Sequence, residues 1–504
     1  MSESTMYGWK RWHIWLFALF VFILAYLTYF HRYWDPPHVF WDENYHIASA
    51  QKYLHGIYFM EQHPPLGKLL VAAGEKMFGP NAVTDQFLDT DYGTQFEGFS
   101  FAGYRFFSAL LSWWTAPILF AILLLLIRNP LWSALLSFFY VFDNALIVHL
   151  RGAMLEGPLM FFTALTVLFS LLALRDRMKM ERLALWGALL GVSFALALAT
   201  KVLGLILILL LLPVLWKIMP HWKRALAFLG CFALPFLFVY CTVWEIHFAL
   251  GRTVNPALPD AGYYQASEEY KTVLDTGRMG SLASFPVMLR DSWHFVSHYN
   301  GGAPRLDLCK EDENGSPVYF WPFGGRTINY RWETPEGERY SYLYLVPNPA
   351  VWWFAFAGLL LGCGLLASSV LCPPKKALKH RFLMGSLVAM YFSYMFVVSR
   401  IDRVLYLYHY FIPLFLTFII TALVFDELQT MGKKALHEHG KTAIALTLAA
   451  LIFIGHQFYR PFSYYLPLTD AQFARRNIFN LWDLRCVNCP NENGLVIPQG
   501  KFEQ

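Results

Sequence analysis

Long apolar runs separated by short polar turns set the pattern of the chain. A run of about 17–25 predominantly apolar residues is long enough to cross a bilayer. Eleven runs approach or reach that length, at residues 13–31, 103–127, 131–149, 154–174, 183–199, 202–217, 224–247, 349–371, 382–399, 406–426 and 442–458. The break at Lys201 is the least distinct, because residues 183–217 also fit one long kinked helix. The pattern predicts a mainly α, polytopic membrane protein with about 11 transmembrane helices.

Basic residues cluster in every second turn between these runs. If the N-terminus, with Lys10 and Arg11, is cytoplasmic, all of these turns face the same side, as the basic cytoplasmic loops of membrane proteins do. The clusters are Arg128, Arg175 to Arg182, Lys217 to Arg224, Lys375 to Arg381 and Lys433 to Lys441. An odd number of spans then places the C-terminus outside. We also expect the first run to be retained rather than cleaved, because it lacks a small-residue cleavage site.

The spans divide the chain into four predicted regions. Residues 1–247 hold the first seven spans and an external loop at 32–102, and residues 349–458 hold the last four. Between them, residues 248–348 are expected to form a small strand-and-loop cap, and residues 459–504 an external tail. Within the first loop, apolar side chains on one face predict a helix along the outer membrane surface, with Lys68 and Glu75 on other faces. That apolar stripe consists of Leu66, Leu69, Leu70, Ala73 and Met77.

The composition supports a membrane protein and excludes several other classes. Hydrophobic residues make up 57% of the 504 residues, and charged residues 15%, against about 25% in an ordinary soluble domain. Disordered, collagenous and nucleic-acid-binding proteins are excluded on this ground, and a net charge of +5 is too small to indicate a polyanion partner. Cys486 and Cys489 favour a local disulfide in the tail, because one C-x2-C pair cannot supply four zinc ligands. No dedicated metal motif is evident, although a divalent cation at Asp42 or Glu43 stays open.

Ionisable residues collect at the external ends of spans that are far apart in the sequence. Each such residue is costly in or near a bilayer and therefore needs a functional or structural partner. A cavity that opens to the outer face would gather them. They are Asp42, Glu43, His46, His63, Lys68, Arg105, Arg151, Glu156, Lys201, His247, Arg400 and Arg403.

Two chemical roles suit these residues, and each has a simpler alternative. Asp42 and Glu43 fit a base and a group that orients an alcohol, or else a solvated pair in a loop. Arg105 and Arg403 fit bidentate ligands of a phosphate, or else arginines that extend to the membrane surface. Lys201 is open to the same two interpretations.

Several further residues carry weaker signals. Glu156 fits an ion pair with Arg151, and His63 a turn histidine. Arg400 and Arg403 are expected one helical turn apart, with Arg403 on the same face as Tyr410. Asp143 and Asn144 lie inside the third span, where helix packing by hydrogen bonds is the simplest account.

A series of short motifs extends along nearly the whole chain. In order they are DE at 42–43, HPPLGK at 63–68, YR at 104–105, FDN at 142–144, TK at 200–201, IHF at 246–248, WPF at 321–323, NP and WW at 348–353, R-x5-HYFIP from Arg403 to Pro413, and YYLPLTD at 464–470. This series resembles the protein O-mannosyltransferase family. The resemblance implies a fold of GT-C type and a glycosyltransferase that moves mannose from a polyprenyl-phosphate donor to Ser/Thr hydroxyls of exported proteins, with inversion at the anomeric carbon.

The resemblance also implies roles for particular residues. Asp42 would be the catalytic base, and Glu43 would help to hold the acceptor. Arg105, Lys201 and Arg403 would contact the donor phosphate, with His409 and Tyr410 nearby. The remaining pocket or acceptor-site residues would be His63, Lys68, Arg151 and Glu156.

Some features depart from the family pattern. Glu156 stands where an Asp is usual, and Leu150 where a Ser is common. The 248–348 segment is too short for the MIR domain that eukaryotic members carry there, which points to a bacterial-type member in the cytoplasmic (inner) membrane, with its catalytic face outside. Two alternatives stay open: a GT-C transferase that glycosylates a lipid or envelope glycan, and a transporter of lipid-linked sugars. A transporter would show paired half-repeats, which we do not detect in the sequence.

Overall fold

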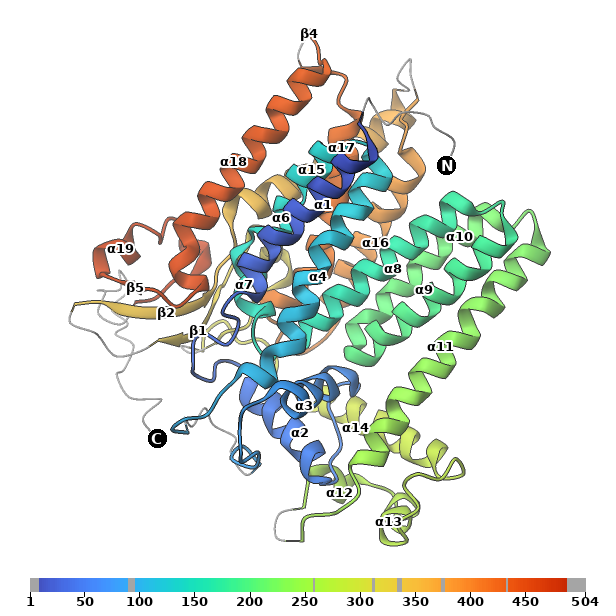
Figure 1. Cartoon of the computed structure of the whole chain (residues 1–504), viewed down its shortest axis with the longest axis vertical. Helices are drawn as coiled ribbons and strands as arrows, with labels where there is room; N and C mark the ends of the chain where they lie inside the picture. The colour runs from blue at the N-terminus through green and yellow to red at the C-terminus, as the bar shows by residue number, and fades with distance from the viewer. Residues whose placement is uncertain are drawn as a thin grey trace. The chain divides into compact units, whose positions relative to one another are not determined.

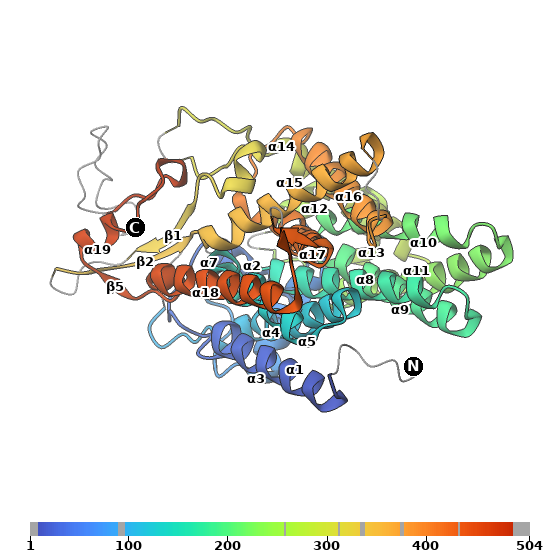
Figure 2. The ribbon, with the colours of Figure 1, turned by 90° about the horizontal axis from the view of Figure 1, so that it is seen from above.

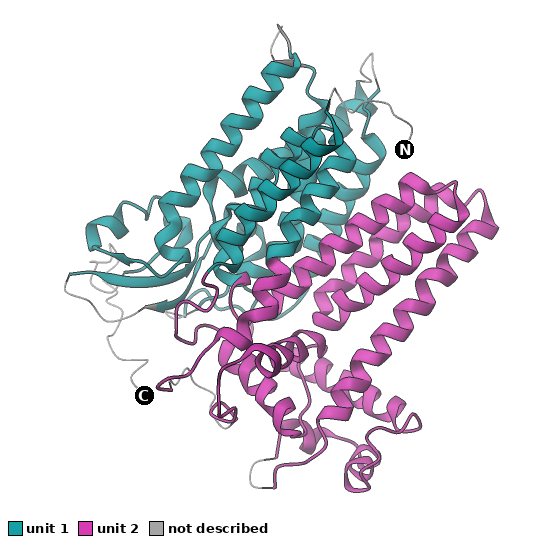
Figure 3. Cartoon of the chain, in the orientation of Figure 1, with its two compact units in different colours: residues 1–31, 113–149, 306–504 teal, residues 32–112, 150–305 magenta. Residues whose placement is uncertain are grey.

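The chain folds into two compact units, which we describe separately (Figure 3). The structure is a computed structural model, and it describes residues 9–88, 96–256, 259–310, 313–332, 338–372, 377–431 and 434–486. Most of these residues lie in helices (Figure 1). Unit 1 comprises residues 1–31, 113–149 and 306–504, and unit 2 comprises residues 32–112 and 150–305. Helix α4 (Ala102–Ile127) carries the chain from one unit to the other.

Unit 2 is built mainly from long helices that lie side by side. Its elements are α2 (Glu43–His55), α3 (Leu66–Phe78), α8 (Glu156–Asp176), α9 (Met180–Thr200), the 3₁₀ helix η2 (Val202–Leu210), α10 (Leu211–Ile218), α11 (Trp222–Leu250), α12 (Ala261–Gln265), α13 (Glu268–Asp275) and α14 (Phe285–Gly302). Helices α8, α9 and α11 are neighbours in Figures 1 and 2. Gly191 of α9 allows this close approach, because a Cβ there would lie 2.2 Å from the carbonyl oxygen of Phe232 on α11.

Helix α3 confirms the helix predicted in the HPPLGK segment, but not the face that it packs. The buried residues of α3 include Lys68, Val71 and Glu75, whereas the apolar stripe beginning at Leu66 is only partly buried and Met77 is 64% exposed. The expectation that Lys68 and Glu75 lie away from the packed face is wrong. Both side chains find polar partners inside the unit, and a period of 3.6 residues cannot reveal such partners.

Unit 1 surrounds a fully buried helix. Its elements are α1 (Arg11–Ala25), the π-helix η1 (Tyr26–Phe30), α5 (Pro130–Leu136), α6 (Phe138–Val141), α7 (Asn144–Leu150), η3 (Val318–Phe323), β1 (Ile328–Trp332), β2 (Tyr340–Leu345), α15 (Pro349–Leu371), α16 (Arg381–Ser399), η4 (Leu407–Tyr410), α17 (Phe411–Glu427), β3 (Thr430–Met431), β4 (Lys434–Ala435), α18 (Glu438–Ser463), β5 (Pro467–Leu468), α19 (Asp470–Ala474) and η5 (Asn480–Trp482). Every residue of α17 from Phe411 to Phe425 is buried, with α15 and α16 among its neighbours.

A small antiparallel sheet in the order β1-β2-β5 also belongs to unit 1. Ile328 pairs with Leu345, and Tyr340 pairs with Leu468. Aromatic side chains pack beneath it, among them Tyr344 and Trp482. The described part of residues 459–504 therefore packs on this sheet. Cys486 is disulfide-bonded, whereas Cys489 lies outside the described residues.

The segment at 248–348 differs from the strand-and-loop cap that we expected. Its first half forms α12, α13 and α14 in unit 2, and its second half contributes β1 and β2 to unit 1. The start of α13 carries a local signal that composition overlooks. The Ser267 hydroxyl accepts the Tyr270 amide hydrogen at 3.3 Å, and Glu268 and Glu269 lie in the first turn, where negative charge suits the helix dipole.

Among the described residues, fewer helices qualify as spans than the sequence predicted, although every predicted run is largely helical. Within the described residues, nine helices are long and apolar enough to cross a membrane. A tenth candidate, Pro130–Val141 with Asn144–Leu150, is bent by 63°. The remaining apolar helix, Val202–Ile218, is shorter. The structure thus supports a multi-pass membrane protein and does not confirm the count of eleven.

Candidate active site

The predicted site residues fall into two sets, one in each unit. Unit 2 contains Asp42, Glu43, His63, Lys68, Arg105, Arg151, Glu156 and Lys201, and unit 1 contains Arg403, His409 and Tyr410. The set in unit 2 comes from α2, α3, α4, α8 and the loops beside them. It is organised around three buried ion pairs.

The first pair joins Glu43, the first residue of α2, to Arg105 in the first turn of α4. The Nε of Arg105 donates to Oε1 of Glu43 at 2.7 Å, and Nη2 donates to Oε2 at 2.7 Å. The other guanidinium hydrogens go to the carbonyl oxygens of Trp34 (2.7 Å), Pro36 (2.6 Å) and His38 (2.6 Å). A guanidinium has five N–H donors, and all five are used.

Glu43 is as fully engaged as its partner. Its Oε1 also accepts the Ala153 amide hydrogen at 2.8 Å, and its Oε2 accepts that of Phe40 at 3.1 Å. The Arg105 guanidinium lies over the rings of Phe40 and Phe101, and both charged side chains are 0% exposed. The Glu43 carboxylate is therefore not solvated, and the Arg105 guanidinium does not extend to the membrane surface. Together the two side chains clamp residues 34–43.

Asp42 directly precedes Glu43 in the chain and therefore lies beside this clamp. It is half-buried at the N-cap position, and its carboxylate does not cap the helix. The preceding residue, Trp41, adopts a left-handed backbone with φ of 51°. A side-chain-bearing residue holds such a conformation only where its surroundings enforce it. Glu43 bonds the Phe40 amide and Arg105 bonds three carbonyl oxygens within residues 34–38, so both hold the segment that leads to Asp42.

The second and third pairs are lysine–glutamate pairs. Lys68 Nζ donates to Oε2 of Glu61 at 2.5 Å, and the Ser49 hydroxyl donates to the other oxygen of Glu61 at 2.6 Å. Lys201 Nζ donates to Oε1 of Glu156 at 2.5 Å. All four charged side chains are almost fully buried, which excludes the interpretation of Lys201 as a lysine that extends to the membrane surface.

Two histidines lie within electrostatic range of these lysines. Burial, followed by the positive charges of Lys201 and Lys68, holds the pKa of His63 well below its usual value. Burial and Lys68 lower the pKa of His46 to about 3, and His46 Nδ1 lies 2.7 Å from the Ala153 carbonyl oxygen. Both rings are therefore neutral at physiological pH. His46 Nδ1 carries the hydrogen, because only a donor suits a carbonyl oxygen.

The remaining unit 2 candidate, Arg151, is also buried. Its Nη2 donates to the Arg32 carbonyl oxygen at 2.5 Å. Glu156, for which an ion pair with Arg151 was one interpretation, forms an ion pair with Lys201. Glu61 was absent from the predicted set. It lies in the same EQHPPLGK segment as Lys68, and an acidic residue so close to a lysine near a span was the available signal.

In unit 1, His409 and Tyr410 belong to η4, directly before α17. The His409 ring stacks on Tyr408 at 4.7 Å between centroids. The Tyr410 hydroxyl lies 3.1 Å from that of Tyr391, and its ring lies 5.3 Å from Trp352. Both predicted residues are thus held among aromatic side chains.

Arg403 does not lie on a helix. Helix α16 ends at Ser399, with Arg400 as its C-cap, and η4 begins at Leu407. The expectations that Arg400 and Arg403 are one helical turn apart and that Arg403 shares a helical face with Tyr410 are therefore wrong. Arg403 is half-buried in this connection, which falls between the predicted runs 382–399 and 406–426.

Two family models match the chain. Residues 8–250 match the model described as dolichyl-phosphate-mannose-protein mannosyltransferase, and residues 294–482 match the C-terminal four-TMM region of protein O-mannosyltransferase. The chain belongs to the protein O-mannosyltransferase family. The resemblance carried by the sequence motifs is confirmed.

Related protein O-mannosyltransferases come from animals and bacteria. Protein O-mannosyl-transferase 2 of Danio rerio is 27% identical over 277 residues, which cover 52% of this chain and 36% of the relative. Protein O-mannosyltransferase 1 of Drosophila pseudoobscura pseudoobscura is 31% identical over 48% of this chain and 28% of the relative. The polyprenol-phosphate-mannose–protein mannosyltransferase of Mycobacterium tuberculosis is 24% identical over 62% of this chain and 63% of the relative. The matches span about a third of the two animal proteins and less than two thirds of the bacterial one.

The fold of this family member matches a solved structure. That structure is the protein O-mannosyltransferase Pmt1–Pmt2 complex of Saccharomyces cerevisiae bound to the sugar donor, and the TM-score is 0.81. The likeness covers 94% of this chain and 93% of that chain at 15% identity. The predicted fold class, mainly α and of GT-C type, is confirmed.

A divalent cation does not fit Glu43. Both of its carboxylate oxygens accept two N–H donors each, so a metal ion would have to displace hydrogen bonds of a fully buried ion pair. In the part of the chain that the structure describes, no three His, Cys, Asp or Glu side chains gather as metal ligands do.

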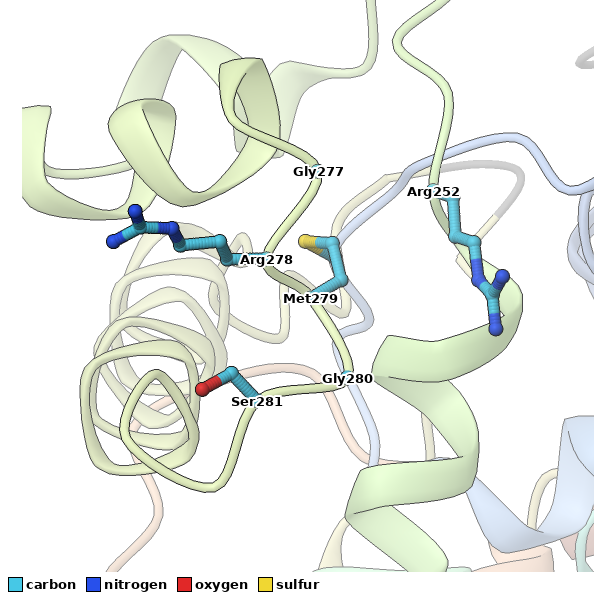
Figure 4. A pocket seen from close by; sticks show the side chains of 6 residues that line it. All are labelled: Arg252, Gly277, Arg278, Met279, Gly280 and Ser281. Atoms are coloured by element: carbon cyan, nitrogen blue, oxygen red, sulfur yellow. The ribbon is translucent and has the colours of Figure 1, made fainter.

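A cavity of about 440 Å³ lies elsewhere in unit 2, beyond the end of α11 (Figure 4). Its lining is Arg252, Gly277, Arg278, Met279, Gly280 and Ser281. The two guanidinium groups extend in different directions in Figure 4 rather than toward one point. None of the predicted site residues lines this cavity, and it carries no argument about function.

Proposed function

We propose that this chain is an inverting membrane glycosyltransferase that moves mannose from a polyprenyl-phosphate donor to Ser/Thr hydroxyls of exported proteins. The observation that carries the proposal is the placement of Asp42. Its half-buried carboxylate follows a left-handed residue, beside the Glu43–Arg105 clamp, in a chain of the protein O-mannosyltransferase family.

The chemistry requires little more than a base and a set of cations. A sugar on a lipid phosphate already has a good leaving group, so the enzyme must take a proton from the acceptor hydroxyl and stabilise charge that grows on the phosphate. Asp42 takes the proton as the hydroxyl oxygen attacks the anomeric carbon. The bond to the phosphate oxygen breaks, and direct displacement inverts the anomeric configuration.

The positively charged side chains differ in how many of their N–H donors are already bonded within the protein. Arg105 is committed to Glu43 and three carbonyl oxygens, so its role is to position Asp42. Lys201 remains our candidate for the donor phosphate in unit 2, with Glu156 holding its ammonium. Lys68, His63 and Arg151 complete the pocket around it. Arg403, His409 and Tyr410 in unit 1 keep their predicted donor-binding role, which substitution can test.

The names of relatives support the choice of substrates. The mycobacterial protein is named for polyprenol-phosphate-mannose as donor and for protein as acceptor, and the animal proteins are named protein O-mannosyltransferases. By this proposal the chain is a bacterial-type member of the cytoplasmic membrane. The basic turns then face the cytoplasm together with the N-terminus, and the catalytic face and C-terminus lie outside.

A transfer assay tests the proposal directly. Purified full chain in nanodiscs is incubated with polyprenyl-phosphate-mannose and a Ser/Thr peptide, and mass spectrometry reads the acceptor. We expect a hexose on the peptide hydroxyl, no product with an Ala-substituted peptide, and a linkage inverted relative to the donor. Transfer only to a lipid or glycan would show that the acceptor is not a protein. Flipping of the donor in liposomes without any transfer would show that the protein is a transporter rather than a transferase.

A further inference from the structure

Asp143 is a fully buried acidic residue that the proposed reaction does not use. It lies in unit 1 at the 63° bend between Pro130–Val141 and Asn144–Leu150, and its exposed fraction is 0%. A carboxylate within a candidate span is costly unless other groups stabilise it. The partners of Asp143 therefore indicate why the chain has an acid here.

Three N–H groups donate to this carboxylate. Oδ1 accepts the Leu146 amide hydrogen at 2.8 Å, at the start of α7. Oδ2 accepts from Trp352 Nε1 at 2.9 Å and from the backbone N–H of Asn348 at 3.2 Å, at the start of α15. The positive ends of two helix dipoles thus meet at one carboxylate. Their positive potential favours a negative charge on Asp143 inside the unit.

Asn348 fixes the same junction from the other side. It is the N-cap of α15, and its Oδ1 accepts the Ala350 amide hydrogen at 3.1 Å. Its Nδ2 donates to the carbonyl oxygens of Phe142 (2.9 Å) and Ile452 (2.8 Å). The carbonyl that the bend releases is therefore bonded, and the first turn of α15, which carries Trp352, is held in place.

Trp352 connects this junction to the HYFIP motif. Its indole Nε1 is bonded to Asp143, and its ring lies 5.3 Å from the ring of Tyr410 at an angle of 41°. Trp352 and Tyr410 are both 1% exposed. A ring in so dense a setting cannot rotate without moving its neighbour, so a change in the orientation of Trp352 would displace the Tyr410 ring.

We propose that Asp143 is a positioning residue that acts through the indole N–H of Trp352 to fix the His409–Tyr410 segment. It connects three motifs that are far apart in the sequence: FDN at 142–144, NP with WW at 348–353, and HYFIP at 409–413. The consequence for catalysis rests on the proposed function, because it assumes that His409 and Tyr410 contact the donor. The structural coupling itself does not depend on that assumption.

The test combines two single variants and their double variant in the full chain. In Asp143→Asn, one oxygen becomes an NH₂ group that faces N–H donors. Trp352→Phe keeps an aromatic ring beside Tyr410 but removes the indole N–H together with part of the buried ring. Hydrogen–deuterium exchange of the peptide covering residues 403–413 is expected to rise in both variants. The donor KM is expected to rise by about tenfold or more, the effect of losing a hydrogen bond to a charged group, with a smaller change in kcat.

The double variant decides whether the two residues act as one unit. If Asp143 acts through Trp352, the double variant has the donor KM of the more affected single variant. Ser463→Ala is the matched control, because it removes the bond from Asn144 Nδ2 (2.9 Å) at the same bend, without a bond to α15. It is expected to leave exchange in 403–413 unchanged.

Two results overturn the proposal. One is unchanged exchange in 403–413 in Trp352→Phe, and the other is single-variant effects on KM that multiply in the double variant. Absence of transfer by the unsubstituted chain would instead contradict the proposed function. The exchange measurement would then still show whether the coupling exists.

Discussion

Glu43 and Arg105 form a two-point ion pair from which water is excluded, with both N–O distances at 2.7 Å and both side chains 0% exposed. The same guanidinium bonds three carbonyl oxygens of the segment that leads to Asp42. The pair therefore connects the start of α2, the start of α4 and the loop at residues 34–38 that precedes α2. In the proposed mechanism, this pair positions the base, Asp42.

Breaking this pair is expected to cost stability as well as activity. Glu43→Gln leaves the Arg105 charge buried without its counter-ion, which costs about 3–5 kcal/mol in comparable buried pairs. Arg105→Lys is expected to behave similarly, since an ammonium group cannot replace five N–H donors in a planar fork. Thermal unfolding in detergent measures the loss. Glu269→Gln is the control, because its pair with Arg290 is exposed and should leave the melting temperature unchanged.

Asp42→Asn is expected to separate catalysis from folding. Asn has nearly the same shape as Asp, and the Asp42 side chain does not cap α2, so the variant should still fold. Removing a general base lowers the rate by about 10²–10⁴-fold, and transfer to the Ser/Thr peptide should fall by that factor. Near-normal turnover in a folded Asp42→Asn variant would remove Asp42 as the base.

The sequence predicted where helices form much better than it predicted which charges meet. Apolar length is a local property, so α8, α9 and α15 lie close to the predicted runs. Ion pairing is tertiary: 62 positions separate Arg105 from Glu43, and 45 separate Lys201 from Glu156. A single sequence shows that these charges are costly near a bilayer, but it does not show which of them neutralise one another.

Local irregularities were the other limit. The apolar run at 202–217 reads as a span, but its first nine residues form a 3₁₀ helix and the whole segment is short. The connection at 400–406 and the bend at Asp143 are likewise stabilised by tertiary hydrogen bonds, for example from the Ser316 amide to the Leu405 carbonyl oxygen. Hydropathy carries no information about such bonds.

A charge-removal series at Lys201 and Glu156 tests whether the lysine serves the fold or the donor. Lys201→Met should destabilise by about 3–5 kcal/mol, because it leaves the Glu156 carboxylate without its buried ammonium. Adding Glu156→Gln removes that charge and should recover most of the melting temperature. If Lys201 contacts the donor phosphate, transfer stays low in the double variant and the donor KM stays high. A double variant with normal donor KM would assign Lys201 a structural role alone.

The crossing of α3 and α4 should not tolerate a methyl group at Gly74. A Cβ there would lie 2.3 Å from the carbonyl oxygen of Gly103, and a backbone atom cannot move aside as a flexible side chain can. Gly74→Ala is expected to cost about 1–3 kcal/mol, as overpacking does. Gly230→Ala in α11 is the matched control, because a Cβ there meets nothing within 4 Å and alanine favours a helix. Equal melting temperatures for the two variants would contradict the close crossing.

His46 should make the protein less stable in acid, and the sign follows from its pKa. Burial holds the folded-state pKa at about 3, while the unfolded chain has the ordinary value of about 6.5. Between these values the unfolded state binds a proton that the folded state does not. Stability is therefore fully present above pH 6.5 and falls as the pH drops toward 3, by about 1.4 kcal/mol per pH unit.

Replacing His46 by Asn should flatten this dependence. An Asn amide can still donate to the Ala153 carbonyl oxygen, as the imidazole Nδ1 does at 2.7 Å, but it has no proton to gain. Melting temperatures measured from pH 7 to pH 4.5 should fall less steeply in His46→Asn than in the unsubstituted chain. His294→Asn is the control, because His294 is exposed on α14. If both variants follow the unsubstituted curve, the acid sensitivity arises from groups other than His46, with His63 the next to substitute because burial and two lysines lower its pKa in the same direction.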